Sequence, residues 1–141
     1  MATPSQQPKS AAASLAQNRL AIQAQIEFEL SFFNALLERR PEFVEVLKAH
    51  AKNLAMIRRH PEGLQMDRRI TKLRPHDALA RYNLACSLVL TRQFDEAIAE
   101  LRRAVELGYR DFPFMMKDRD LDGIRRDPRF RAILREYDRK R

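Results

Sequence analysis

Three aspartates near the end of the chain, Asp118, Asp120 and Asp122, alternate with other residues and stand directly before Gly123. Oxygen ligands at this spacing, followed by a glycine, are how a calcium-binding loop begins. Such a loop also needs a carboxylate at its twelfth position to complete the coordination of the ion, and Arg129 stands there instead. A cation at that position opposes a bound ion, so we predict an aspartate-rich turn with local arginine partners and no metal site.

The other side chains that could perform catalysis or bind a transition metal are few and scattered. His50, His60 and His76 are too far apart along the chain to form a metal-binding pair on one helix. Cys86 is the only cysteine, so no internal disulfide can form, and its apolar neighbours indicate a small core or groove residue. The chain has three glycines and no glycine-rich loop that could hold a phosphate. We therefore predict a protein that is not an enzyme and that has no cofactor.

The composition of the 141 residues favours helices over strands. Hydrophobic residues make up 45% of the chain, which is enough for one core, and Ala, Leu, Arg and Glu dominate. No run of alternating β-branched residues indicates a sheet, so we expect an all-α protein. The chain has no apolar stretch of about 18 residues and no apolar signal region at its start. We expect no membrane span and a cytoplasmic protein.

A long helix is predicted near the N-terminus. Residues 1–10 contain two prolines and small or polar residues, which indicates a flexible tail. Residues 11–40 contain no proline or glycine and predict one helix, which Pro41 ends. Two apolar lines run along it at helical spacing, one with Ile26, Leu30, Phe33 and Leu37 and the other with Phe28, Phe32 and Leu36. Both lines need cover, from the same chain or from another copy.

The middle of the chain contains a repeat. Residues 44–77 can be laid over residues 78–111 without a gap, at a spacing of 34 residues. The matching positions are Ala51 with Ala85, Leu54 with Leu88, Arg58 with Arg92, Glu62 with Glu96 and Leu73 with Leu107. A 34-residue period built from two helices is typical of tetratricopeptide repeats, and the second copy closely resembles that family through "YNLA" and "FDEAI". The first copy resembles it more weakly, because His50 replaces the usual leucine.

The resemblance implies a solenoid of helical hairpins, one in residues 44–77 and one in residues 78–111. It places Ala85 and Ala97 where the helices of the second hairpin cross most closely. Each hairpin leaves an apolar face that a neighbour must cover. We therefore expect residues 112–141 to form a C-terminal cap, which ends in an amphipathic helix. That helix starts after Asp127 with Pro128, and its apolar face carries Phe130, Ile133, Leu134 and Tyr137.

The net charge of +8 and the pI of about 10.2 favour an acidic partner, which is a carboxylate-rich peptide, an anionic surface or nucleic acid. Residues 1–43 carry four basic and four acidic side chains. The excess of positive charge lies in residues 44–77 and 112–141. The other interpretation of this excess is a soluble basic surface with no binding role.

The resemblance also implies where a partner binds, since the first helix of each tetratricopeptide repeat lines a concave groove. Some family members hold a C-terminal carboxylate there with lysine and asparagine side chains. Lys48 and Asn83 fall on such positions, Lys52 stands where that clamp has an asparagine, and Lys117 can supply a further basic group. We predict an adaptor or scaffold that binds a peptide or helix, acidic or carboxylate-ended, in a partly basic groove. Its groove residues are Lys48, Lys52, Tyr82, Asn83, Cys86 and Lys117.

Two alternatives stay open. Arginine pairs such as Arg58-Arg59 and Arg125-Arg126 could bind RNA phosphates. We rank RNA second, because the pairs Arg68-Arg69 and Arg102-Arg103 are expected on the outer face with few aromatic residues to stack bases. The other alternative is a homo-oligomeric scaffold that pairs through the N-terminal helix, since two repeats are few for a stable array.

Overall fold

Helices account for every regular element in residues 7–139, the part of the chain that the computed structural model describes. Side chains are described for residues 10–136 and 139. The predicted all-α class is confirmed for this part of the chain. The elements are α1 (Gln7–Arg39), α2 (Val44–Met56), α3 (His60–Leu73), α4 (Ala78–Leu90), α5 (Phe94–Glu106), α6 (Phe112–Lys117), the 3₁₀ helix η1 (Arg119–Ile124) and α7 (Pro128–Asp138). Among these helices, none is long and apolar enough to cross a membrane.

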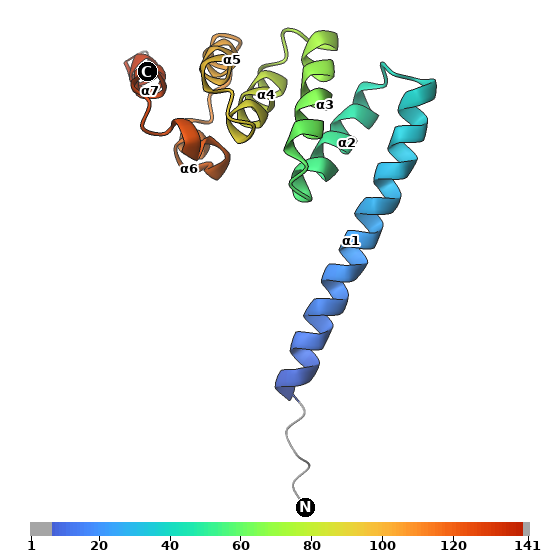
Figure 1. Cartoon of the computed structure of the whole chain (residues 1–141). Coiled ribbons are helices and arrows are strands. Elements are labelled where there is room, and N and C mark those ends of the chain that lie inside the picture. The colour runs from blue at the N-terminus through green and yellow to red at the C-terminus, as the bar shows by residue number, and fades with distance from the viewer. Residues whose placement is uncertain (1–6, 140–141) are drawn as a thin grey trace, which may run out of the picture.

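Two helical hairpins form the centre of the molecule, α2 with α3 and α4 with α5 (Figure 1). The hairpins contact each other through α3 and α4, and α1 packs against α2. The first helices of the two hairpins begin at Val44 and Ala78, and the second helices begin at His60 and Phe94. Corresponding helices therefore start 34 residues apart in both cases. Each hairpin therefore lies within one of the two 34-residue segments that match in sequence.

The turns of the two hairpins have the same construction. Arg58 and Arg92 hold the same place in the two turns, and their backbone φ angles of 59° and 63° are both left-handed. The residue that follows each arginine donates its N–H to the carbonyl five residues earlier, at 2.9 Å in the first turn and 2.8 Å in the second. A left-handed residue with this hydrogen bond is a common end of a helix. The chain thus follows the same backbone path twice.

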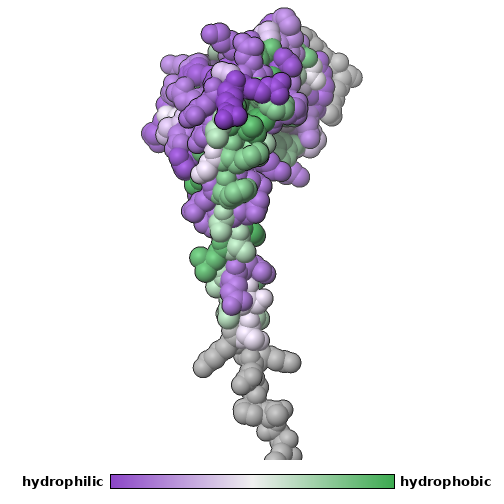
Figure 2. All heavy atoms as spheres, turned by 90° about the vertical axis from the view of Figure 1, so that its right-hand side faces the viewer, coloured by the Kyte–Doolittle hydropathy of each residue, from purple (hydrophilic) through white to green (hydrophobic). Residues whose placement is uncertain are grey.

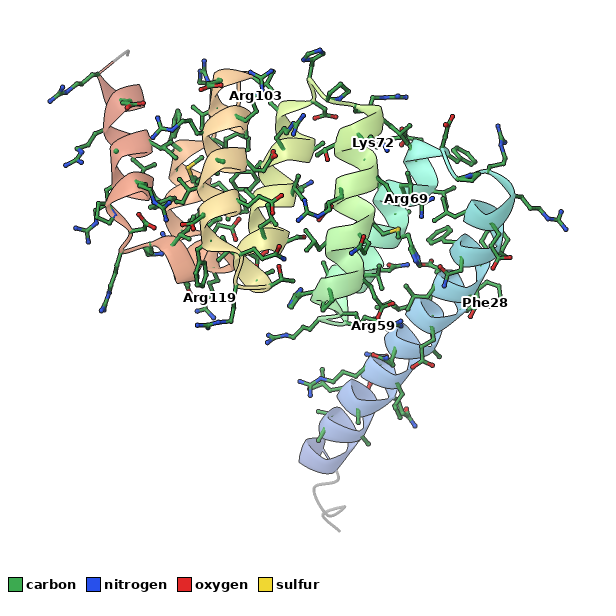
Figure 3. The ribbon with its side chains drawn as sticks, turned by 45° about the horizontal axis from the view of Figure 1, so that its top comes forward. Phe28, Arg59, Arg69, Lys72, Arg103 and Arg119 are labelled. Carbon is green, nitrogen blue, oxygen red and sulfur yellow. The ribbon has the colours of Figure 1, made fainter. Side chains whose placement is uncertain are left out.

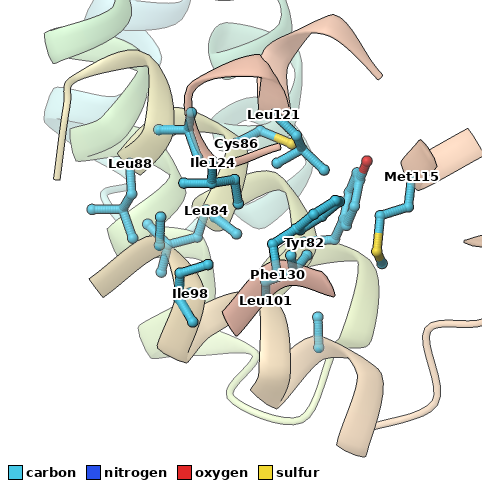
Figure 4. Close-up of a cluster of buried hydrophobic side chains, with 14 of the residues drawn as sticks. Tyr82, Leu84, Cys86, Leu88, Ile98, Leu101, Met115, Leu121, Ile124 and Phe130 are labelled. Atoms are coloured by element: carbon cyan, nitrogen blue, oxygen red, sulfur yellow. The ribbon is translucent and has the colours of Figure 1, made fainter. Parts of the chain in front are cut away.

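The main core lies in the second hairpin, and the C-terminal elements complete it (Figure 4). Ala85 and Ala97 are fully buried there, as expected for the close crossing of α4 and α5. The larger members of this core include Leu84, Leu88, Leu101, Leu121, Ile124, Phe130 and Ile133. In the first hairpin Gly63 takes the place of Ala97, and a Cβ atom on it would lie 3.9 Å from the side chain of Leu54. A small residue therefore keeps the two helices close in each hairpin.

The C-terminal elements close one end of the molecule. η1 packs on α4, and α7 packs on α5. Asp118 begins η1, because its Oδ1 accepts a hydrogen bond of 3.0 Å from the N–H of Asp120. Phe130 and Ile133 of α7 are buried, as the predicted apolar face requires. The side chain of Tyr137, the last position of that predicted face, lies outside the described residues.

The C-terminal half of α1 packs against the first hairpin, where Ile26, Leu30 and Leu37 are buried beside α2. The side chains of residues 10–25 are exposed, and this half of the helix projects away from the hairpins (Figure 1). One of the two predicted apolar lines is therefore covered by the chain itself. On the other line, Phe28 and Phe32 remain 67% and 51% exposed.

The predicted boundary between the tail and the first helix was wrong. α1 begins at Gln7, so residues 7–10 are helical and do not belong to the predicted tail. Pro8 is compatible with this start, because a proline in the first turn has no intrahelical acceptor to lose. The tail prediction for residues 1–6 falls outside the described residues.

Candidate functional site

Four of the predicted groove residues are exposed. Lys48 and Lys52 lie one turn apart on α2, Asn83 lies on α4, and Lys117 ends α6. Their side chains are open to solvent and thus to a ligand. The structure therefore leaves the basic part of the predicted groove accessible on the first hairpin.

The other two predicted groove residues are buried, which corrects the prediction. Tyr82 and Cys86 are only 2% and 7% exposed. The ring of Tyr82 stacks on Tyr109 with 4.2 Å between centroids, and its hydroxyl donates a hydrogen bond of 2.6 Å to Oδ2 of Asp118. The sulfur of Cys86 lies 3.8 Å from the same oxygen. The chain's own Asp118 therefore covers the part of α4, beside Tyr82 and Cys86, that was predicted to line the groove.

Burial controls the chemistry of this cluster. Burial and the hydrogen bond to Asp118 raise the pKa of Tyr82, and burial together with the charges of Asp118 and Asp120 raises the pKa of the Cys86 thiol. Both groups stay neutral near neutral pH and act as donors to the carboxylate. A protonated, buried thiol is a poor nucleophile. This chemistry is that of a structural contact.

The aspartates of the same segment lie close enough to consider a metal. Cys86, Asp118 and Asp120 each offer one possible ligand atom, and these three atoms lie within 4.8 Å of one another. Both oxygens of Asp118 already accept hydrogen bonds, Oδ1 from the N–H of Asp120 and Oδ2 from Tyr82. A third aspartate of the segment, Asp122, pairs with Arg125 at 3.1 Å. The segment thus has the geometry of a capped turn with a local arginine partner.

A groove with a volume of about 570 Å³ lies between α1 and α2. Its walls are mostly apolar, and polar groups stand at one edge. Its main wall residues are Ile22, Ile26 and Phe33 of α1 and Ala49, Lys52 and Met56 of α2. We call it the α1–α2 groove. It includes one of the six predicted groove residues, Lys52, so the predicted site is retained only in part and is shifted towards α1.

The polar edge of the α1–α2 groove joins its two helices. Nδ2 of Asn53 donates a hydrogen bond of 2.7 Å to Oε2 of Glu29. This bond, with smaller contributions from Gln25 and Lys52, lowers the pKa of Glu29, which therefore stays ionised. Lys52 is the cationic side chain in the lining of the groove, and the ionised Glu29 lies close enough to interact with it.

Two residues of the α1–α2 groove, Ile22 and Met56, were not among the predicted groove residues. Both are large apolar side chains that remain more than half exposed, at 55% and 56%. The signal for Ile22 was present, because it lies one turn before Ile26 and extends the covered apolar line of α1. Met56 stands at the end of α2, where only the packing of α1 brings it into a groove.

Several arginines of the pairs that suggested RNA binding contact the protein's own acceptors. Arg68 forms two hydrogen bonds to Glu96, at 2.6 and 2.9 Å, and Arg102 forms one to Glu136 at 3.0 Å. Arg69 donates to the backbone oxygen of Pro41 at 2.8 Å. Figure 3 shows the labelled basic side chains spread over several helices, with Arg59 at the start of α3, Arg69 and Lys72 along it, Arg103 on α5 and Arg119 on η1. This arrangement does not form a single track for a phosphate backbone.

Comparison with known proteins gives one partial similarity. No family model matches the chain. The chain is similar to a chloroplastic protein of Arabidopsis thaliana, with 32% identity over 69 residues. The aligned region is 48% of this chain and 21% of that protein, so the chain spans about a fifth of the length of this curated relative. The chloroplast location describes the Arabidopsis protein alone.

Proposed function

We propose that the protein is a tetratricopeptide-type interaction module that acts as an adaptor or scaffold and binds a peptide or helix at the α1–α2 groove. The observation that carries the proposal is an open, mostly apolar groove of about 570 Å³ with Lys52 at its edge. Hairpins that start at a 34-residue interval and share the same left-handed turn support the repeat assignment. A partner would bury an apolar side chain between the helices and place a carboxylate near the lysines of α2.

The expected affinity follows from the size of these contacts. Burying one large apolar side chain contributes about 1.5–3 kcal/mol. A contact between Lys52 and a partly desolvated carboxylate contributes about 1–3 kcal/mol. Their sum, about 2.5–6 kcal/mol, corresponds to a weak complex with a roughly millimolar dissociation constant even before the cost of immobilising the peptide is subtracted. A tighter partner must therefore extend along α2 past Lys48.

The second hairpin contributes less to binding in this proposal than the sequence suggests. Asp118 fills the place beside Tyr82 and Cys86, so a peptide reaches α4 only at its exposed side chains. Asn83 is the predicted groove residue on that helix that is exposed. The partner thus contacts mainly α1 and α2.

An array of short synthetic peptides tests the proposal. The peptides carry an apolar residue close to a free C-terminal carboxylate, and each is also made with an amidated end. We expect binding, measured by fluorescence anisotropy, that weakens about tenfold on amidation, because about 1.4 kcal/mol of charged contact is lost. Lys52→Glu and Ile22→Ser are expected to weaken binding to the same degree, since both side chains belong to the groove.

Lys72→Glu provides the matched control, because Lys72 is an exposed lysine on α3, outside the groove. It reverses the same charge and is expected to change affinity less than about twofold at physiological salt, where long-range electrostatics is screened. The proposal is wrong if no peptide binds, or if Lys72→Glu weakens binding as much as Lys52→Glu. An affinity that is unchanged by Ile22→Ser and varies only with the net charge of the protein would also contradict binding in the groove.

A further inference from the structure

The outer side of α1 carries an uncovered stripe, which meets the α1–α2 groove only at Ala21. The stripe consists of Gln17, Ala21, Ala24, Phe28, Phe32 and Ala35, all of them exposed and spaced three or four residues apart. We call it the outer stripe. Figure 2 shows a hydrophobic band along α1 on the side turned to the viewer. The rings of Phe28 and Phe32 stack at 6.4 Å between centroids with no helix of the described chain over them.

We propose that the outer stripe pairs with the outer stripe of a second copy, with the two α1 helices antiparallel. The stripe is self-complementary in size only in that direction. In an antiparallel pair, the two-fold axis passes between Ala24 and Phe28. Phe28 then packs against Ala24 of the other copy, and Phe32 lies close to Ala21 of the other copy. A parallel pair would set phenylalanine against phenylalanine and alanine against alanine, which leaves gaps and overlaps.

The distribution of charge supports a second copy as the occupant. Residues 1–43 carry four basic and four acidic side chains, so the whole net charge of +8 lies in residues 44–141. Two such bodies repel one another, and α1 is the part of the chain that brings copies together without net repulsion. The outer stripe itself contains no charged residue. The antiparallel direction also attaches the two positive bodies at opposite ends of the helix pair.

The geometry of α1 fits this arrangement. The exposed half of the helix, residues 10–25, extends beyond the hairpins, and in the pair it covers the half of the partner's α1 that carries the phenylalanines. A helix of this length without tertiary contacts is only marginally stable in water, so pairing supplies the cover that it lacks. The overlap of about 25 residues is about 37 Å long and 10 Å wide. This footprint, about 370 Å² on each copy, is smaller than that of standard specific interfaces, so we expect a weak, reversible dimer.

Sedimentation equilibrium of the full chain tests the pairing. We expect a reversible dimer, and Phe28→Glu is expected to raise its dissociation constant at least about tenfold, because a charge would be buried opposite Ala24. Leu79→Glu is the matched control, since Leu79 is a large apolar residue on α4 with similar exposure, 59% against 67% for Phe28. The control is expected to leave the dimer unchanged. Circular dichroism of each variant confirms that the helices are retained.

A distance measurement tests the direction. A spin label on Gln17→Cys, in a Cys86→Ala background, is expected to report a separation of about 28 Å between copies, because Gln17 then lies near Ala35 of the other copy. A parallel pair would bring the two labels to about 10 Å. The proposal is overturned by a monomer at all concentrations, by a dimer that persists in Phe28→Glu, or by the short distance.

Discussion

Asp67 offers the sharpest test of how the two hairpins are joined. It lies on α3 and is only 8% exposed, and its Oδ2 accepts a hydrogen bond from the hydroxyl of Ser87 on α4. Burial raises the pKa of Asp67 from its usual 3.8 to about 6, although the hydrogen bond from Ser87 opposes the change. Near neutral pH the side chain is therefore an ionised carboxylate held between two helices with one hydroxyl as its partner.

The sign of the effect on stability follows from this raised pKa. Asp67 in the folded protein holds its proton more tightly than in the unfolded chain. The protonated side chain therefore stabilises the fold fully below pH 3.8, and this stabilisation is lost as the pH rises through about 6. Each pKa unit corresponds to about 1.4 kcal/mol, so the loss is about 3 kcal/mol at most. Asp67→Asn keeps the shape and the acceptor oxygen and removes the charge. We expect it to raise the free energy of unfolding at neutral pH by about 1–3 kcal/mol.

Urea unfolding followed by circular dichroism measures this difference at two pH values. Near about pH 7.5 the variant is expected to be more stable than the wild type, and near about pH 4 the two are expected to agree within about 0.5 kcal/mol. Asp95→Asn is the control, because the side chain of Asp95 is 92% exposed and pairs with Arg129 on the surface. It is expected to change stability by less than about 1 kcal/mol. The reasoning is refuted if Asp67→Asn does not raise the free energy of unfolding, or if it raises it equally at both pH values.

Three further substitutions test individual contacts, each by thermal or urea unfolding. His50→Leu is expected to raise stability by about 1–3 kcal/mol, because Nδ1 of this buried histidine has no hydrogen-bond partner; a lower stability would contradict this. Tyr82→Phe removes the donor to Asp118 and is expected to cost about 1–3 kcal/mol, and an unchanged midpoint would show that the contact is not stabilising. Gly123→Ala is expected to cost about 1–3 kcal/mol, because its Cβ would lie 2.9 Å from a ring carbon of α5. Gly63→Ala, with 3.9 Å of room, is its control and is expected to be neutral or stabilising.

The helices and much of the core could be predicted from the sequence, because their signals are local or strictly periodic. The spacing of 34 residues aligns two segments, and each of them contains one hairpin. Proline, aspartate and the apolar period place the starts of α3, α4 and α7. The left-handed turns at Arg58 and Arg92 carried no such signal, since arginine has no preference for positive φ.

The candidate site could be predicted only in part, because it depends on contacts between distant residues. Tyr82 and Asp118 are 36 positions apart, and no pattern in the chain indicates that η1 folds back over α4 to join them. The sequence therefore predicted Tyr82 as a groove residue and left Cys86 as either a core or a groove residue, although both are buried. The α1–α2 groove likewise arises from the angle at which α1 meets α2, which helical periodicity does not specify.

The two ends of the helical array differ, and this difference explains why both proposals involve α1. At the C-terminal end, Leu121, Ile124 and Phe130 seal the second hairpin, and Asp118 satisfies the buried hydroxyl of Tyr82. Stacked helical hairpins need such a cover at each end, because each hairpin leaves an apolar face. At the N-terminal end, one helix covers α2 with a single apolar line and leaves its other side in water. Among the described residues, half of the exposed large apolar side chains therefore lie on α1, including Ile22 in the groove and Phe28 and Phe32 in the outer stripe.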